Sequence, residues 1–159
     1  MEEKKIEISY QVLKIEELSK IDAHLMNVVN ETTVKAYAPY SNFKVGAAVM
    51  FIDGCNVRGS NQENAAYPSG MCAERVALFA ARTLFPDYPI STLGVIAKKD
   101  GNVQSSISLC GACRQVLLET EQRQQQDIRV ILFGRYEAII FSSAKDLLPF
   151  SFGEENLLK

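Results

Sequence analysis

The chain has 159 residues, a formal net charge of −2 and 47% hydrophobic residues. This length suffices to bury roughly two-thirds of the unfolded surface, so we expect a single domain over residues 1–159. Because lysine and arginine do not cluster, the basic face that binds nucleic-acid phosphates is not expected, and the expected partners are small molecules and other copies of the chain.

Export and membrane insertion are also not expected. The longest apolar run, VGAAVMFI at residues 45–52, is far too short to cross a bilayer. The N-terminal sequence MEEKKIEISY is charged where a signal peptide is apolar. We therefore expect a cytoplasmic protein whose four cysteines stay reduced and serve metal binding or chemistry.

The first half of the chain predicts one helix and a β-hairpin. Apolar residues recur at helical spacing within residues 15–36. Residues 44–52 are rich in small and β-branched residues and end at Asp53-Gly54, which favours a hairpin turn. A short strand at residues 56–60 should return beside them.

The second half predicts further alternation of helices and strands. Helices are expected at residues 71–84 and 111–122, a strand between them at 92–98, two later strands at 127–133 and 136–141, and a short helix at 143–148. This alternation predicts an α/β fold of three α/β/α layers, with a central mixed sheet of about five strands.

Three cysteines stand at the starts of two predicted helices. Cys110 and Cys113 form a C-x-x-C, and Cys72 begins the helix at 71–84. A helix N-terminus lowers the pKa of a thiol, and thiolate is the form that binds metal. Three thiolates can hold Zn²⁺ with the fourth position open, as in a catalytic zinc site. Glu74 lies two residues after Cys72, where its carboxylate can reach a zinc-activated water and move protons.

The spacing C-A-E followed by C-G-A-C matches a deaminase signature that allows three cysteine ligands. Longer matching stretches are AYAPYSNFKVGAAV (36–49), GSNQENAAYPSGMCAER (59–75), CGACRQVLLE (110–119) and LLPFSF (147–152). With these the chain resembles the small, homotetrameric, zinc-dependent cytidine deaminases that act on free nucleosides. The N-x-E-N before C-A-E separates this family from related deaminases that use a histidine ligand and act on nucleotides, guanine or nucleic acid.

The resemblance implies a zinc centre and a reaction. Cys72, Cys110 and Cys113 would bind zinc, the activated water would attack C4 of the base, and Glu74 would shuttle protons. The products of cytidine and 2′-deoxycytidine would be uridine and 2′-deoxyuridine plus ammonia, as in pyrimidine salvage. Three thiolates leave the zinc complex with a formal charge of about −1. Arg75 is the candidate to stabilise these thiolates by donating hydrogen bonds.

The resemblance also implies substrate contacts. Asn61 and Glu63 would bind the ribose 3′ hydroxyl, backbone groups around Ala65 and Ala73 would hold the pyrimidine, and Phe43 would flank it. A carboxylate at the ribose would repel a phosphate, which favours nucleosides over nucleotides.

The family's assembly implies two further residues. Tyr67 and Phe152 would reach the site of a neighbouring subunit, so that active sites are completed across the interfaces of a homotetramer.

Other interpretations of the cysteines stay open at this point. The C-x-x-C alone can be a redox dithiol. A structural zinc site needs a fourth protein ligand, for which Cys55 is the spare cysteine. A zinc-stabilised binding protein without activity has no need of Glu74. Deaminases of blasticidin or modified pyrimidines are the nearest enzymatic rivals, and N-Q-E-N argues against them.

One position departs from the family pattern. Leu109 stands before Cys110 where the family usually has proline. Leucine restores an N–H donor and adds backbone freedom, while it keeps a carbonyl that can face the departing amino group. We expect the site to tolerate this change.

Overall fold

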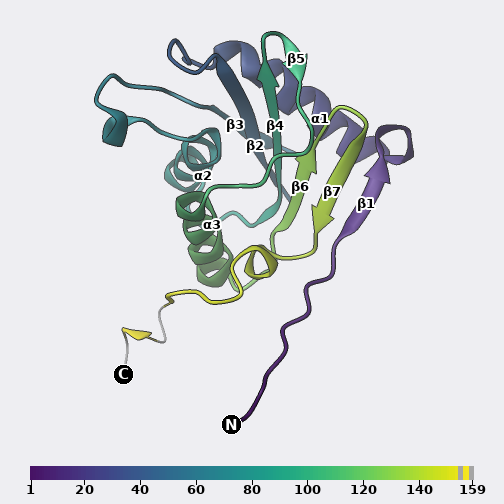
Figure 1. The fold of residues 1–159 in the computed structure, drawn as a ribbon, viewed down its shortest axis with the longest axis vertical. Coiled ribbons are helices and arrows are strands. Elements are labelled where there is room, and N and C mark those ends of the chain that lie inside the picture. The colour runs from purple at the N-terminus through teal and green to yellow at the C-terminus, as the bar shows by residue number, and fades with distance from the viewer. Residues whose placement is uncertain (154–155, 158–159) are drawn as a thin grey trace.

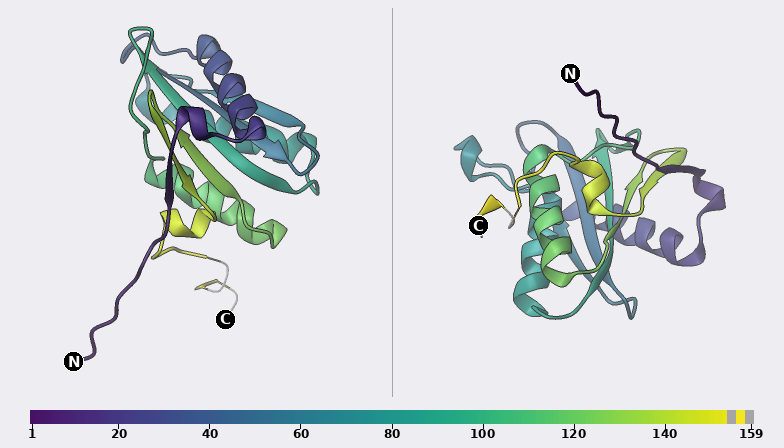
Figure 2. Two further views of the ribbon diagram at one scale, coloured as in Figure 1. Left: turned by 90° about the vertical axis from the view of Figure 1, so that its right-hand side faces the viewer. Right: turned by 90° about the horizontal axis from the view of Figure 1, so that it is seen from below.

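The computed structural model describes residues 1–153, 156 and 157. Its strands are β1 (Gln11–Lys14), β2 (Phe43–Phe51), β3 (Asn56–Ser60), β4 (Ile90–Lys99), β5 (Asn102–Val103), β6 (Arg129–Phe133) and β7 (Glu137–Phe141). Its α-helices are α1 (Lys20–Thr32), α2 (Ala73–Leu84) and α3 (Gly111–Gln124). A short 3₁₀ helix, η4 (Ala144–Leu147), follows β7. The strands form one mixed sheet, with α1 on one face and α2 and α3 on the other (Figures 1 and 2).

The strands follow the order β1-β7-β6-β4-β2-β3, and β5 pairs with β4 outside this path. Strands β4 and β6 are parallel, and all other pairs are antiparallel. A parallel pair needs a long crossover connection, which α3 supplies here. The crossover places the start of α3 beside the start of α2 on the same face of the sheet (Figure 1).

The sheet has a hydrophobic core on each face. Along β2, Val45, Ala47 and Val49 pack toward α2 and α3, whereas Ala48 and Met50 pack toward α1. Successive side chains of a strand point to opposite faces, so a strand covered on both sides is apolar throughout. This explains the continuous apolar run VGAAVMFI without any membrane role. None of the helices in the described part of the chain is long and apolar enough to cross a membrane.

The three-layer α/β architecture and the mixed sheet are confirmed, but the sheet has seven strands rather than about five. The additional strands are β1 and β5. Strand β1 has four residues with no buried side chain, and β5 has two residues. Neither is long or buried enough to produce the hydrophobic alternation that a sequence pattern can reveal.

The first helix is shorter than the predicted residues 15–36. Helix α1 covers Lys20–Thr32, flanked by 3₁₀ turns at Ile15–Glu17 and Thr33–Lys35. Ser19 caps α1, since its hydroxyl accepts a hydrogen bond from the Asp22 N–H at 3.2 Å. The buried Asp22 carboxylate also accepts two hydrogen bonds from Arg129, at 2.6 and 2.8 Å. This ion pair fastens α1 to the start of β6.

Gly59 allows α2 to approach β3 closely. A Cβ atom at this position would lie 2.4 Å from the Ala73 carbonyl oxygen and 2.4 Å from the Ala77 nitrogen. No larger residue fits without moving the backbone of the first turn of α2. The glycine therefore helps to place Cys72 and Glu74.

A buried carboxylate holds α3 in place. Glu121 accepts hydrogen bonds from Ile128 N, Ser143 Oγ and Ala144 N, each at 2.7 Å. These contacts join α3 to the segment before β6 and to η4. The orientation of α3, and with it the position of Cys110 and Cys113, is set by this network together with the hydrophobic core.

Candidate active site

Two helix N-termini bring three cysteines together. Cys72 is the N-cap of α2, Cys110 is the N-cap of α3, and Cys113 lies in the first turn of α3. Their Sγ atoms lie within 4.8 Å of one another, with 3.8 Å between Cys72 and Cys110. The helix dipoles place partial positive charge at this point, which favours thiolates.

The cluster fits a zinc ion by its donor chemistry and its spacing. Sulfur ligands at about 2.3 Å from a tetrahedral zinc lie about 3.8 Å from each other. Within the described residues the cluster contains only these three ligands, and Cys55 lies elsewhere, in the exposed turn between β2 and β3. A set of three protein ligands leaves the fourth position open, which is typical of a catalytic rather than a structural zinc site.

The thiols of the cluster differ in pKa. A hydrogen bond from Cys113, together with those from Arg75 and Cys110, lowers the pKa of Cys72 to about 5, although burial opposes this. The same hydrogen bond to Cys72, together with burial, raises the pKa of Cys113. Without metal, one thiolate at Cys72 is therefore favoured. A bound divalent cation would remove this difference, because coordination deprotonates each thiol that binds it.

Arg75 lies beside the sulfur cluster. Its Nη2 atom is 3.8 Å from Cys72 Sγ, and its buried Nε has no hydrogen-bond partner among the described residues. The guanidinium therefore lies where it can offset negative charge on Cys72. This contact supports the role predicted for Arg75 from the sequence.

Glu74 is the buried acid of the site. It is the second residue of α2 and only 5% exposed. Burial raises the pKa of this carboxyl, and the negative charge of Cys72 raises it further. A raised pKa brings a carboxyl closer to the pH range in which general acid–base catalysis operates.

A cavity of about 440 Å³ opens over these residues. This volume is within the range of small-molecule sites. The residues of the cavity wall that were predicted from the sequence are Phe43, Asn61, Glu63, Tyr67, Cys72, Ala73, Glu74, Arg75 and Cys110. Cys113 is fully buried beneath, while Ala65 and Phe152 do not line the cavity of their own chain.

Asn61 and Glu63 make hydrogen bonds within the chain. The Asn61 amide accepts from Val45 N and donates to Phe43 O, both at 2.8 Å. Glu63 accepts from Ser41 Oγ and from Tyr40 N, and these bonds hold its pKa below the usual range. Both side chains are thus held at the cavity wall. A carboxylate has about four acceptor positions, so Glu63 keeps capacity for a ligand hydroxyl.

The residues expected at subunit interfaces lie on the surface. Tyr67 is 77% exposed, and its ring packs edge-on against Tyr40 with 6.2 Å between centroids. Phe152 is exposed, and its carbonyl accepts a hydrogen bond from Gln115 Nε2 at 2.8 Å. Ala65 is exposed in the segment between β3 and α2. The roles of these residues in substrate binding and at a neighbouring subunit stay predictions.

Sequence reasoning missed Arg114, which directly follows the C-x-x-C. Its guanidinium donates to Leu109 O at 2.9 Å, Ser108 Oγ at 2.7 Å and Leu147 O at 3.0 Å. The Leu109 carbonyl, which we expected to be available to the departing amino group, is therefore bonded to Arg114. The Leu109 side chain is buried in the core. The only feature of the sequence that could have indicated this role is the position of Arg114 directly after the C-x-x-C.

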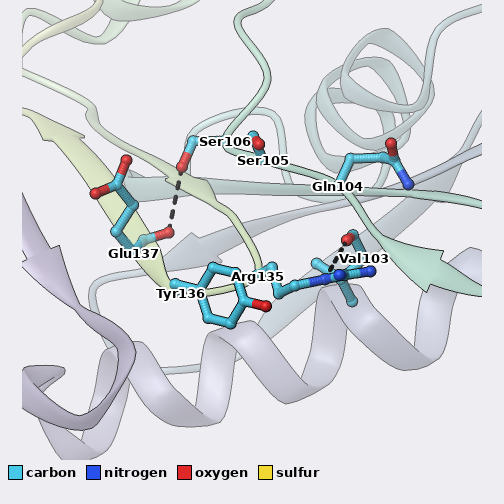
Figure 3. A pocket seen from close by; sticks show the side chains of 7 residues that line it. All are labelled: Val103, Gln104, Ser105, Ser106, Arg135, Tyr136 and Glu137. Atoms are coloured by element: carbon cyan, nitrogen blue, oxygen red, sulfur yellow. Dashed lines mark hydrogen bonds between the residues drawn. The ribbon is translucent and has the colours of Figure 1, made fainter.

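A second cavity of about 450 Å³ lies apart from this site, where the segment after β5 passes the β6–β7 turn (Figure 3). It shares no lining residue with the first cavity. Its polar groups are partly used within the chain, since Ser106 Oγ donates to Glu137 O and Arg135 Nε donates to Val103 O. It contains no cysteine, and no candidate acid–base residue of the sequence lies in it.

The fold and the cysteine cluster together define a zinc-binding α/β domain of the deaminase type. The chain matches the family described as the cytidine and deoxycytidylate deaminase zinc-binding region over residues 19–126. It is 38% identical over 122 residues to the cytidine deaminase of Halalkalibacterium halodurans, covering 77% of this chain and 86% of the relative. It is 39% identical over 123 residues to that of Sporosarcina psychrophila, covering 77% and 85%.

Solved structures agree with this assignment. The crystal structure of cytidine deaminase from Burkholderia pseudomallei superposes with a TM-score of 0.68 at 38% identity, covering 82% of this chain and 98% of that one. The crystal structure of cytidine deaminase from Mycobacterium tuberculosis superposes with a TM-score of 0.65 at 32% identity, covering 82% of this chain and 96% of that one. The chain therefore belongs to the cytidine deaminase family, and Zn²⁺ is its cofactor.

Proposed function

We propose that this chain catalyses the hydrolytic deamination of cytidine and 2′-deoxycytidine to uridine and 2′-deoxyuridine plus ammonia. The observation that carries this proposal is the juxtaposition of three cysteine sulfurs within 4.8 Å and the buried Glu74 at one cavity. A structural zinc site has no use for a buried carboxyl beside an open ligand position. A redox dithiol has no use for a third cysteine at the same point.

The reaction needs a nucleophile at C4, a proton at N3 and a proton on the departing amino group. Zinc held by Cys72, Cys110 and Cys113 would supply the Lewis acid that activates water. Glu74 would take one proton from that water and give it to N3. It would then move the second proton of the same water, from the oxygen now bonded to C4, to the leaving nitrogen as the C4–N bond breaks. The raised pKa of Glu74 supports this shuttle, since the carboxyl exchanges protons most readily near its own pKa. Arg75 would stabilise the thiolates.

The cavity wall offers groups for the rest of the nucleoside. Phe43 would flank the base, and the free backbone N–H at the start of α2, at Ala73, would donate to it. Asn61 and Glu63 would bind the ribose 3′ hydroxyl from positions held by their own hydrogen bonds. Ala65 would take part in binding the pyrimidine through its backbone, as the family resemblance implies.

The charge of the cavity favours a nucleoside over a nucleotide. Among the described residues that line the cavity, Arg75 is the only lysine or arginine, and it contacts Cys72. Glu63 adds negative charge at the wall. A 5′-phosphate would therefore meet no free cation, although the family description includes deoxycytidylate deaminases.

The homotetramer, the cytoplasmic location, the part in pyrimidine salvage and the single domain over residues 1–159 belong to the same proposal. They rest on the family resemblance and on the sequence. In a homotetramer, the exposed Tyr67 and Phe152 would complete the sites of neighbouring subunits.

An absorbance assay tests the activity. Adding the zinc-loaded protein to cytidine or deoxycytidine should lower the absorbance of the cytosine base, and cytidine 5′-monophosphate should react far more slowly. Glu74→Gln should reduce turnover by a factor of about 10² to 10⁴, the usual contribution of a positioned acid–base group, with zinc content unchanged. Glu119→Gln, an exposed glutamate of α3, is the matched control and should retain full activity. Zinc-loaded wild-type protein without turnover would refute the proposal in favour of a structural site.

A further inference from the structure

The N-terminal arm, defined here as residues 2–14, has the pattern of a strand that is covered on one face. Ile6, Ile8, Tyr10 and Val12 occupy every second position, and they are 51%, 41%, 58% and 50% exposed. Alternating β-branched and aromatic residues are typical of a half-buried strand. Within the described chain, however, the arm pairs with β7 only over Gln11–Lys14. Tyr10 follows next in this register, and its ring centroid lies 5.7 Å from that of Phe141. Residues 2–9 continue past the end of β7 and run away from the body of the protein (Figures 1 and 2).

The arm also presents a hydrogen-bonding edge that no described residue pairs with. Strand β1 is the last strand of the sheet order, and Ile15 N donates to Tyr136 O at 3.1 Å in continuation of the β1–β7 register. The backbone groups of alternate residues in a strand point to the same edge, so those of Leu13 and Gln11 face β7. The backbone groups of the even-numbered residues point to the opposite edge, away from β7. These residues are Ile6, Ile8, Tyr10 and Val12. A free edge of this kind accepts another strand.

The sequence of the arm is complementary to itself in one antiparallel register. With a two-fold axis at Ile8, Ile8 lies opposite its own copy and Ile6 lies opposite Tyr10. Cross-strand pairs of apolar and aromatic residues stabilise a sheet. The same register places Glu2 opposite Lys14, which are of opposite charge.

Neighbouring registers oppose like charges. An axis at Glu7 places Glu7 opposite its own copy. An axis at Ser9 places Lys4 opposite Lys14. Like charges directly opposite each other destabilise a strand pair. The charges of the arm therefore favour the axis at Ile8 over these two neighbouring registers.

We propose that the N-terminal arm pairs with the arm of a second copy of this chain, antiparallel about Ile8, and thereby joins the two seven-stranded sheets into one. The occupant of the free edge is a second copy because the charge pattern of the arm complements itself. The arm lies before the family match, which begins at residue 19. This interface is accordingly an addition to the deaminase domain, and it stands independently of the proposed reaction.

Disulfide trapping tests this register. In a Cys55→Ser background that removes the exposed thiol outside the cluster, the full-length, zinc-loaded protein carries either Ile8→Cys or Ile6→Cys. Opposite residues of an antiparallel pair have Cα atoms about 5.5 Å apart, which is within the range of a disulfide. Two residues at position 6 would lie roughly 13 Å apart, so mild oxidation should give at least about tenfold more covalent dimer for Ile8→Cys than for Ile6→Cys.

The yield for Ile8→Cys should not fall on dilution, because the two arms are already paired before oxidation. Both substitutions are on the same exposed face of the arm, so folding and thiol reactivity are matched. Equal dimer yields at the two positions, or no dimer from Ile8→Cys, would overturn the proposal. A dimer that forms only at high protein concentration would overturn it as well, since it would reflect collisions.

Discussion

Arg114→Ala should loosen the segment that leads into Cys110. The guanidinium donates three hydrogen bonds, to Leu109 O, Ser108 Oγ and Leu147 O. It thereby holds the residues before the second zinc ligand against the end of η4. Alanine removes all three donors and leaves no group that could replace them.

The magnitude follows from the acceptors that lose their partner. Leu109 and Leu147 are 3% and 5% exposed, so water reaches these residues poorly once the arginine is gone. A buried acceptor without a partner costs about 1–3 kcal/mol, and the Ser108 hydroxyl is exposed and can bind water instead. We therefore expect Arg114→Ala to lower the free energy of unfolding by about 2–5 kcal/mol. Arg114→Lys should recover less than half of this, because one ammonium group cannot reproduce the planar fork of donors.

Urea denaturation of the zinc-loaded variants measures the effect, and zinc retention against a chelator reports on the site itself. Arg58→Ala is the matched control. Arg58 makes two exposed contacts, an ion pair with Glu31 at 3.3 Å and a hydrogen bond to Asn56 Oδ1 at 3.4 Å, so its loss should change the stability by less than about 1 kcal/mol. If Arg114→Ala unfolds at the same urea concentration as Arg58→Ala and retains zinc equally well, the reasoning about Arg114 is wrong.

Four further outcomes are expected. Arg75→Ala should weaken zinc binding by about 10- to 100-fold in a chelator competition, and unchanged zinc affinity would contradict a role in thiolate stabilisation. Gly59→Ala should destabilise the fold by about 1–3 kcal/mol or more in urea denaturation, because its Cβ would lie 2.4 Å from the backbone of α2; a stable, fully active variant would show that the helix can move freely. Burial raises the pKa of Asp22, but hydrogen bonds from Arg129 and Ser19 outweigh burial and bring the pKa below 3.8. The stability that this carboxylate contributes is therefore present above pH 3.8 and is lost as the pH falls through the pKa of the folded state. The difference in stability between wild type and Asp22→Asn should shrink accordingly in denaturation curves at about pH 3 compared with pH 7, and a constant difference would argue against the ion pair as its cause. Leu109→Pro should change stability by less than about 1 kcal/mol, because the N–H of Leu109 has no partner among the described residues and the loss of one buried carbon is offset by a stiffer unfolded chain. Leu109→Ala should cost about 2–4 kcal/mol, and equal damage from the two substitutions would refute this account.

The positions of the three cysteines and of Glu74 at helix starts could be predicted because each depends on local sequence. Cys72 and Cys110 both precede a helical pattern, which places them at N-caps, and Glu74 follows Cys72 within the same first turn. A helix start is encoded by residues next to it in the chain, so these positions are readable without the fold. The burial of Glu74 is less local, since it depends on what packs over the first turn of α2.

The contacts of Arg114 and Glu121 could not be predicted. Both side chains bond to groups that come from other segments, such as Leu147 for Arg114 and Ser143 for Glu121. No periodicity in the sequence indicates which distant carbonyl or hydroxyl a polar side chain will meet. The same holds for Asn61 and Glu63, which were expected to contact a ligand. Asn61 bonds to the backbone of β2, and Glu63 bonds to Tyr40 and Ser41 in the segment before it.

Strand β1 shows a similar limit. Apolar and polar residues alternate over residues 6–12, but β1 itself does not continue this alternation. Only Leu13 of β1 packs against the core, and the pairing with β7 joins residues far apart in the chain. Pairing of distant segments is decided by which sheet edge is available, and that is a property of the assembled sheet.

The sequence by itself determined the elements of the proposed chemistry, which are three thiols and a carboxyl at the starts of two helices. It also determined the apolar runs that specify a sheet covered on both faces. These are consequences of residue type and short-range spacing. Only the tertiary structure decided that the two helix starts meet within 4.8 Å, that Arg114 holds Leu109, and that β1 leaves a free edge. Each of these depends on packing between distant segments, where close contact and exclusion of water select among many arrangements that local sequence leaves equally open.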